Sequence, residues 1–380
     1  MFLKSCPRWS DEAVEQSWRS SACLALLLTL GIGAPLFALA DWSAGLDVPL
    51  QRDYAALSRI LVAMPLLLAT LPLFDSMIDR ALDHPERAGL LSGANLARQR
   101  RWAARLRRLR CNRVVIAGMI LVAFAGALLQ PWLPGPLRGL EGWGYSASGK
   151  LNLAGGWYCF LFLPIFRLLM LLWLWRLLLW LVLLGSLGFL RPRLNPAHPD
   201  GAGGLGYLGF VQQRLSPLLV AGGFMMAGSA ANRIAHLGET VGDLILPLVG
   251  YVVIYPLLLL LPLFLTTPLL LRSKRNGLFD YALIGHSLSR AFEESWVSNP
   301  MPPAEQLQSP NPSALADFGA VHATVTDMRF LPIRPWGIAA MVLSAGAPLL
   351  LLVFLQVPLE QLLRIALAEL PPLDLIPGGL

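Results

Sequence analysis

The chain is constrained most by a series of apolar runs, each long enough to cross a lipid bilayer as a helix. A transmembrane helix needs about 20 mostly apolar residues, and seven stretches of the chain meet this requirement. They cover residues 21–40, 60–79, 114–133, 157–190, 216–237, 243–271 and 336–356. Charged residues make up only 14% of the chain, against about 25% in soluble domains. The sequence therefore predicts an all-α, polytopic bundle of about seven transmembrane helices.

Arginine and lysine are distributed unevenly between the segments that connect these spans. Cytoplasmic segments close to spans are enriched in both residues. With the N-terminus inside, four segments are cytoplasmic: 1–20, 80–113, 191–215 and 272–335. These segments contain 22 of the 30 basic residues, whereas the outer segments contain five and the spans three. We therefore predict a multi-pass protein with its N-terminus inside and its C-terminus outside.

This topology divides the chain into five parts. They are residues 1–79 with the first two spans, a basic cytoplasmic helix at 80–113, spans three to six at 114–271 with a glycine-rich cytoplasmic loop at 191–215, a cytoplasmic helical segment at 272–335, and residues 336–380 with the last span and an amphipathic tail. The basic helix contains ten of the basic residues, and we expect it to lie near anionic lipid headgroups rather than on nucleic acid.

The cytoplasmic segment 272–335 has apolar residues at helical spacing in two stretches, about 275–297 and 313–330, joined by a proline-rich linker. Such spacing predicts two amphipathic helices. Their apolar faces need a partner, which is each other, the basic helix or the membrane surface.

Two spans differ from a plain transmembrane helix. The span 157–190 is 34 residues long, or about 51 Å as a helix, so it must tilt or project into the cytoplasm. The span 243–271 contains Pro247, Pro256, Pro262 and Pro268. Prolines remove backbone hydrogen bonds within a span, and we expect a bent or broken helix there.

Three charged residues lie well inside predicted spans. Arg167 and Arg176 belong to the span 157–190, and Asp75 to the span 60–79. Ionisable groups inside a membrane are costly and usually face a protein interior or water. Arg176 and Asp75 have similar depths, so we expect a structural ion pair, with snorkelling of Arg176 to the headgroups as the alternative. For Arg167, near the middle of the membrane, we expect a buried role, such as an anion path or a bond to a backbone carbonyl.

The span 216–237 is rich in small residues. Gly223, Ala227 and Ala231 form a ladder at four-residue spacing, which permits close helix approach. Tight packing is the interpretation that we favour, with a pore-lining or moving helix as the alternative. At the outer end of this span, three polar residues could line an extracellular vestibule: Asn232, Arg233 and His236.

The loop after the span 157–190 contains the densest motif. Its residues of interest are His198, Asp200, Gly201, Gly203, Gly204 and Gly206. The glycines fit GxGxxG, but that fingerprint requires a βαβ unit, whereas a membrane helix precedes the loop. We predict a tight turn in which Asp200 caps the next helix. The alternative is a backbone nest for an anion near Arg191 and Arg193.

Three stretches together support a resemblance: residues 173–180 (WLWRLLLW), residues 198–209 (HPDGAGGLGYLG) and residues 313–318 (SALADF), which lead to Met328 and Arg329. They resemble an uncharacterised family of bacterial polytopic inner-membrane proteins, over roughly residues 165–365. The resemblance implies a bacterial inner-membrane location and no particular activity. It also marks Asp317 and Arg329 as candidate cytoplasmic contacts.

No arrangement typical of an enzyme is found. The five histidines are dispersed, the four cysteines form no CxxC pair, and protease, kinase and P-loop motifs are absent from the sequence. We predict no enzymatic activity, no cofactor, no metal site and no disulfide framework.

The first functional hypothesis is a channel or transporter, with anions as the candidate solute and the intramembrane arginines near its path. The alternative is a non-enzymatic scaffold or signalling subunit whose cytoplasmic helices bind a partner. A lipid-acting enzyme ranks third. The expected partners are membrane lipids, with a homo-oligomer and a cytoplasmic protein left open.

Overall fold

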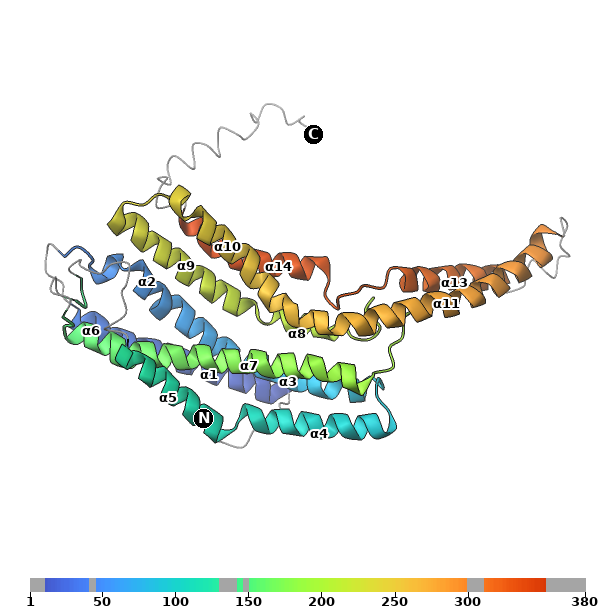
Figure 1. Ribbon diagram of the computed structural model, residues 1–380, viewed down its shortest axis with the longest axis horizontal. Helices are drawn as coiled ribbons and strands as arrows, with labels where there is room; N and C mark the ends of the chain where they lie inside the picture. The colour runs from blue at the N-terminus through green and yellow to red at the C-terminus, as the bar shows by residue number, and fades with distance from the viewer. Residues whose placement is uncertain (1–10, 41–45, 130–141, 146–149, 299–310, 353–380) are drawn as a thin grey trace, which may run out of the picture.

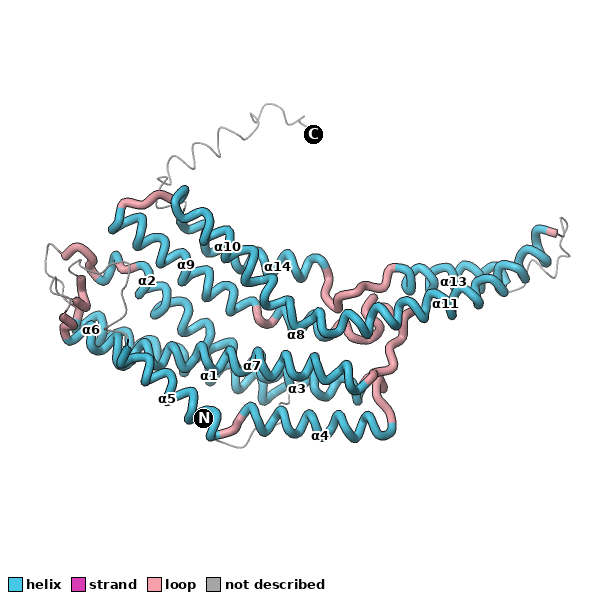
Figure 2. Tube along the Cα trace, viewed as in Figure 1, coloured by secondary structure: helices cyan, strands magenta, loops and turns pink. Residues whose placement is uncertain are grey.

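The computed structural model describes residues 11–40, 46–129, 142–145, 150–298 and 311–352, and these form an all-α bundle (Figures 1 and 2). The helices are α1 (Asp11–Leu39), α2 (Tyr54–Leu57), α3 (Met64–Arg87), α4 (Gly93–Arg110), α5 (Arg113–Leu129), α6 (Leu153–Trp157), α7 (Leu163–Leu190), α8 (Tyr207–Gln213), α9 (Ser216–Leu237), α10 (Val241–Leu260), α11 (Thr267–Phe292), α13 (Asn311–Thr326) and α14 (Pro335–Gly346). Seven helical runs among them are long and apolar enough to cross a membrane, as the sequence predicts.

The connecting segments gather at the two ends of the bundle. At one end, the backbone N–H of Arg193 donates to the carbonyl oxygen of Leu90 over 2.8 Å. At the other, the indole N–H of Trp143 donates to the carboxylate of Asp53 over 3.0 Å. Figure 1 places α4, α8 and the α11–α13 pair toward the first end, and α2 and α6 at the second. The segments assigned to the cytoplasm by their charge thus meet at one end, and those assigned to the outside meet at the other.

The central helix is α7, which continues from α6 through a π-helical stretch, Tyr158–Phe162. The combined run, Leu153–Leu190, has 38 residues and is about 57 Å long. Its fully buried indoles are anchored: Trp173 stacks on Phe74 with ring centroids 5.5 Å apart, and Trp180 donates to the side-chain oxygen of Gln212 over 2.8 Å. The predicted long helix is confirmed.

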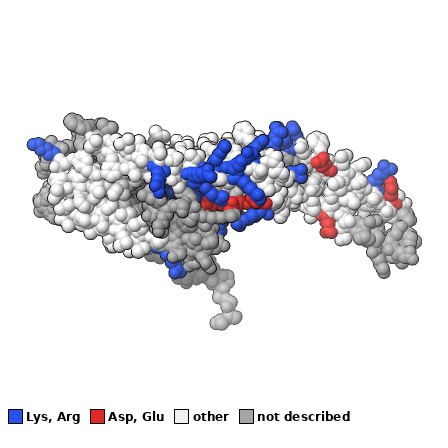
Figure 3. Space-filling view, turned by 90° about the horizontal axis from the view of Figure 1, so that it is seen from below, with Lys and Arg blue, Asp and Glu red and all other residues white. Residues whose placement is uncertain are grey.

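The basic helix α4 folds back along the inner part of α7 (Figure 1). The indole N–H of Trp175 on α7 donates to the carbonyl oxygen of Leu109 over 3.3 Å. On α4, Gln99, Ala103 and Leu106 are buried against the bundle. Figure 3 shows the molecule from the side of α4, where lysine and arginine atoms gather in one band beside a smaller group of acidic atoms.

The proline-rich span is irregular, as expected. A 3-10 stretch, Leu261–Thr266, separates α10 from α11, with Pro262 at its start. Beyond it, α11 continues out of the bundle and pairs with α13 in a helical hairpin, in which the rings of Tyr281 and Phe318 stack with centroids 6.3 Å apart. The two predicted cytoplasmic helices are therefore present, and they are partners for each other.

The small residues of α9 lie where other helices come closest. A Cβ atom on Gly223 would lie 2.8 Å from the carbonyl oxygen of Ala345 in α14. A Cβ atom on Gly222 would lie 2.5 Å from the hydroxyl oxygen of Tyr251 in α10, and Ala227 and Ala231 are buried. Glycine at these two positions lets α14 and α10 pack directly against the α9 backbone.

Cys111 is disulfide-bonded, which corrects the prediction of no disulfide; its partner lies outside the described residues, and a pairing between distant cysteines leaves no mark in local spacing. The predicted C-terminal amphipathic tail and most of the proline-rich linker also lie outside the described residues.

Candidate functional site

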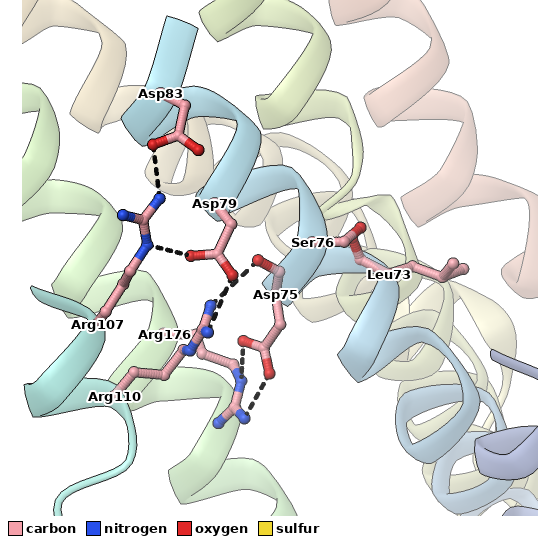
Figure 4. Close-up of polar contacts among 8 residues, drawn as sticks. All are labelled: Leu73, Asp75, Ser76, Asp79, Asp83, Arg107, Arg110 and Arg176. Carbon is pink, nitrogen blue, oxygen red and sulfur yellow. Dashed lines mark hydrogen bonds and ion pairs between the residues drawn. The ribbon is translucent and has the colours of Figure 1, made fainter. Parts of the chain in front are cut away.

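Three carboxylates line one face of the inner half of α3. Asp75, Asp79 and Asp83 recur at four-residue spacing, which places them on the same side of a helix. Figure 4 shows them opposite three arginines, namely Arg176 of α7 and Arg107 and Arg110 of α4. We call these six residues the charge ladder.

The first rung is the predicted pair. Nε and Nη2 of Arg176 donate to the two carboxylate oxygens of Asp75 over 2.8 and 2.9 Å. A third guanidinium nitrogen, Nη1, donates to the carbonyl oxygen of Leu172 over 3.1 Å. The side chain of Arg176 is only 7% exposed. The ion pair is therefore confirmed, and the snorkelling alternative is wrong because the guanidinium faces the interior.

The remaining rungs attach α4 to α3 (Figure 4). Asp79 is shared, because its Oδ2 accepts from Nη2 of Arg110 over 3.0 Å and its Oδ1 from Nε of Arg107 over 3.1 Å. Nη2 of Arg107 reaches Oδ1 of Asp83 over 2.7 Å. Nη1 of Arg110 also donates to the carbonyl oxygen of Asp75 over 3.2 Å.

Most charges of the ladder are buried, so breaking one of its ion pairs would lower the stability of the fold. Asp75, Asp79, Arg110 and Arg176 are each less than a tenth exposed. Buried charges persist only when they are paired and hydrogen-bonded, and here three acids meet three bases. Every carboxylate oxygen of Asp75 and Asp79 accepts from a guanidinium. The ladder holds α3, α4 and α7 together.

Arg167, nine positions before Arg176, faces another neighbour. Its guanidinium lies beside Gly126 of α5, where an added Cβ atom would be 3.2 Å from Nη1. The Nη1 atom is buried, and the side chain as a whole is partly buried. Arg167 and Arg176 thus lie on different sides of α7, and the structure does not bring them into one site.

The three polar residues at the outer end of α9 have separate contacts. Asn232 is 3% exposed, accepts from the backbone N–H of Tyr54 and donates to the Asp53 carboxylate, both over 2.8 Å. Arg233 pairs with Glu239 over 2.8 Å. His236 contacts the carbonyl oxygen of Arg52 over 2.9 Å. Asn232 and His236 fix the segment 50–57 to α9, and Asn232 is too buried to face an open vestibule.

The glycine-rich loop is a nest filled by its own carboxylate. Asp200 accepts from the backbone N–H groups of Ala202, Gly204 and Gly206 over 2.8, 3.2 and 2.8 Å. Gly201, Gly203 and Gly204 have φ values of 62°, 63° and 94°, which favour glycine. Gly206 is the N-cap residue of α8, and no side chain accepts from the first turn of this helix. The predicted cap is therefore wrong, because the Asp200 carboxylate is held by N–H groups of the loop that precedes the helix. The anion in the nest is Asp200 itself.

The electrostatics of the loop follow from these donors. Burial alone would raise the pKa of Asp200, but the three backbone N–H groups and His198, whose Nδ1 lies 2.9 Å from Oδ1, hold the pKa below its usual value. The Asp200 carboxylate is therefore fully ionised at neutral pH.

The segment after α13 contacts this loop. The backbone N–H of Arg329 donates to the carbonyl oxygen of Gly201 over 2.8 Å, and Nη2 of Arg329 donates to the carbonyl oxygen of Asp200. Nζ of Lys274 on α11 donates to the carbonyl oxygen of Met328 over 2.9 Å. Asp317, in contrast, is exposed on α13. Of the two positions marked by the resemblance, Arg329 touches the glycine-rich loop.

Sequence reasoning identified Asp75 and Arg176 but missed the rest of the charge ladder. The available signal was the four-residue repeat of aspartates on α3, followed in the chain by a helix rich in arginine. Comparisons of the chain with protein-family models, with curated proteins and with solved structures give no match. The fold and the seven apolar helices lead to one conclusion: the chain is an integral, multi-pass membrane protein built as an all-α bundle.

Proposed function

We propose that the protein is a non-enzymatic membrane scaffold whose cytoplasmic hairpin of α11 and α13 binds a partner protein. The observation that carries this proposal is the position of the hairpin, which extends along the long axis of the molecule beyond the rest of the bundle (Figures 1 and 2). A bundle that only conducts a solute has no need of such an extension.

The outer face of the hairpin favours a protein partner. Phe279 and Leu283, one helical turn apart on α11, are 71% and 74% exposed. Tyr281 and Gly285 lie against Phe318 of α13 instead. Exposed neighbouring apolar side chains in water commonly mark an interaction surface. An amphipathic helix of a cytoplasmic protein is the partner that such a stripe fits.

We expect Phe279→Ser with Leu283→Ser to abolish capture of the partner, because the change removes the apolar stripe without touching the α11–α13 contact. The measurement is chemical cross-linking in native membranes followed by purification of the full chain. Asp280→Ser with Ala282→Ser, at exposed positions on neighbouring faces of α11, is the matched control and should retain the partner. A partner held equally by both variants, or clean isolation of the wild type alone, refutes the proposal.

An anion path past Arg167 is the second proposal, and the location of its buried Nη1 beside Gly126 supports it. We expect Arg167→Ala to lower chloride flux in proteoliposomes, because it removes the cation from the path. Arg176→Ala should mainly lower stability, since Asp75 holds Arg176. Flux unchanged in both variants rules out the arginine path.

The inner membrane of a bacterium is the location that we propose, on the basis of the motif resemblance. The lipid-acting enzyme gains no support, because the Asp75 carboxylate is engaged by Arg176 and Asp200 by its own loop.

A further inference from the structure

A hollow of about 420 Å³ opens at the inner end of α14, between this helix and α8. Two glycines shape it. Gly209 of α8 lies directly against the carbonyl oxygen of Pro332, and Gly337 of α14 lies against the side-chain amide of Gln213, so a Cβ atom at either position would clash. These close approaches draw α8 and the start of α14 together beneath the hollow.

Two arginines line this hollow from the segment that precedes α14. Arg329 is tethered by its bond to the carbonyl oxygen of Asp200, and Arg334 is exposed at the N-cap of α14. Burial lowers the pKa of Arg329, the charge of Arg334 lowers it further, and Asp200 opposes both effects. Among the described residues, no carboxylate lies within ion-pair distance of either guanidinium. The Asp200 carboxylate also lines the hollow, but it already accepts from three backbone N–H groups of its own loop. With two guanidinium groups and one carboxylate, the lining of the hollow has a net positive charge, which favours an anion.

The helix adds to this potential. α14 begins at Pro335, and no side chain caps its N-terminus. The N-terminal end of a helix carries partial positive charge. In α14 the helix contributes this charge rather than a set of donors, because Pro335 has no N–H and the N–H of Gly337 donates to the carbonyl oxygen of Arg334 over 2.8 Å. The hollow therefore combines two guanidinium groups with the positive end of a 12-residue helix.

The depth of the hollow points to a lipid. α14 starts the seventh span, Pro335–Leu352, so the hollow lies at the cytoplasmic membrane surface. Trp336 and Phe210 at its rim are 76% and 51% exposed. Aromatic side chains are enriched at the level of the headgroups, and basic pockets between transmembrane helices on the cytoplasmic side bind anionic headgroups.

We propose that this hollow binds the phosphate group of an anionic glycerophospholipid of the inner leaflet. Arg329 and Arg334 donate to the phosphate oxygens, and Phe210 and Trp336 contact the glycerol backbone and the first acyl carbons. The site is distinct from the band of charge on the outward face of α4.

The test is native mass spectrometry of the full chain in detergent, titrated with phosphatidylglycerol. We expect Arg334→Gln to weaken binding by about tenfold or more, because a charge-assisted bond to phosphate is lost. Arg334 is exposed, so this variant should keep the thermal unfolding midpoint of the wild type. Arg108→Gln removes the same charge from the exposed face of α4 and should leave the affinity unchanged. Equal binding by Arg334→Gln and the wild type, or equal weakening in both variants, overturns the proposal.

Two further ligands separate a lipid from a free anion. Glycerol 3-phosphate and inorganic phosphate share the phosphate chemistry but lack acyl chains, and we expect each to displace phosphatidylglycerol only at far higher concentration. Displacement at equal concentration overturns the assignment to a lipid. Phosphatidylcholine carries a compensating positive charge, and we expect weaker binding than for phosphatidylglycerol. Equal affinity for the two lipids overturns the requirement for an anionic one.

Discussion

Asp75→Leu lowers the free energy of unfolding by about 3–5 kcal/mol, because it leaves the guanidinium of Arg176 buried without its carboxylate. Arg176→Met has an effect of similar size, since it leaves the carboxylate of Asp75 buried without its guanidinium partner. The double variant Asp75→Leu with Arg176→Met recovers most of the loss, because well-packed apolar side chains of similar volume replace a buried ion pair at little cost. The coupling between the two sites therefore identifies the pair as structural.

The measurement is unfolding of the purified protein in detergent, with all three variants in one double-mutant cycle. Asp317→Asn and Arg108→Gln change exposed charges on α13 and α4, so each should alter the free energy of unfolding by no more than about 0.5 kcal/mol. The prediction is contradicted if the double variant has a free energy of unfolding no higher than that of the less stable single variant.

Asp200→Ala is expected to lower the free energy of unfolding by about 2–4 kcal/mol, because it leaves three backbone N–H groups of the glycine-rich loop without an acceptor. Asp200→Asn keeps one side-chain oxygen in place and removes the charge, so its effect should be smaller. Hydrogen exchange of the amides of Ala202, Gly204 and Gly206 reports the loss directly. Exchange unchanged in Asp200→Ala excludes the carboxylate as the acceptor.

The same residue makes stability depend on pH. Because the folded-state pKa of Asp200 lies below its usual value, its contribution is complete above an unfolded pKa of about 3.9 and is lost as the pH falls through the folded pKa. The difference in stability between the wild type and Asp200→Asn should therefore shrink below about pH 4. A constant difference in unfolding midpoint from neutral to acidic pH contradicts this assignment.

Hydropathy and charge were sufficient to predict the bundle. Each span must satisfy its backbone within itself, so the seven spans are local features that a short window reveals. The depth of Asp75 and Arg176 follows from position within a span, which is why this pair could be predicted from residue numbers alone.

The rest of the charge ladder depends on a tertiary event. Arg107 and Arg110 belong to a basic stretch that suggests a helix facing lipid headgroups. They meet Asp79 only because the chain reverses after α3, at a turn in which Gly89 and Gly93 have positive φ values of 66° and 56°. Periodicity identifies the helix, but it does not report the neighbour on which the helix folds back.

Long-range contacts explain the other gaps. The glycine-rich loop could be recognised as a nest, yet its contact with Arg329 joins positions 129 residues apart. The hollow beside it likewise depends on how α8 meets α14, and no local pattern specifies that meeting. The separate partners of Asn232, Arg233 and His236 were hidden for the same reason, because clustering along one helix does not mean that side chains share a ligand.

The run from α10 through the 3-10 stretch to α11 has a mechanical consequence. With its last π-helical turn it covers Val241–Val297, 57 residues, which makes a rod of about 85 Å. The first part of this rod, α10, belongs to a membrane span, and the second part, α11, is the long helix of the hairpin. Hydrogen-bond geometry is poorer in a 3-10 helix than in an α-helix, so the rod bends most readily at Leu261–Thr266. A load applied at the tip of the hairpin is therefore transmitted to the part that lies beside α9.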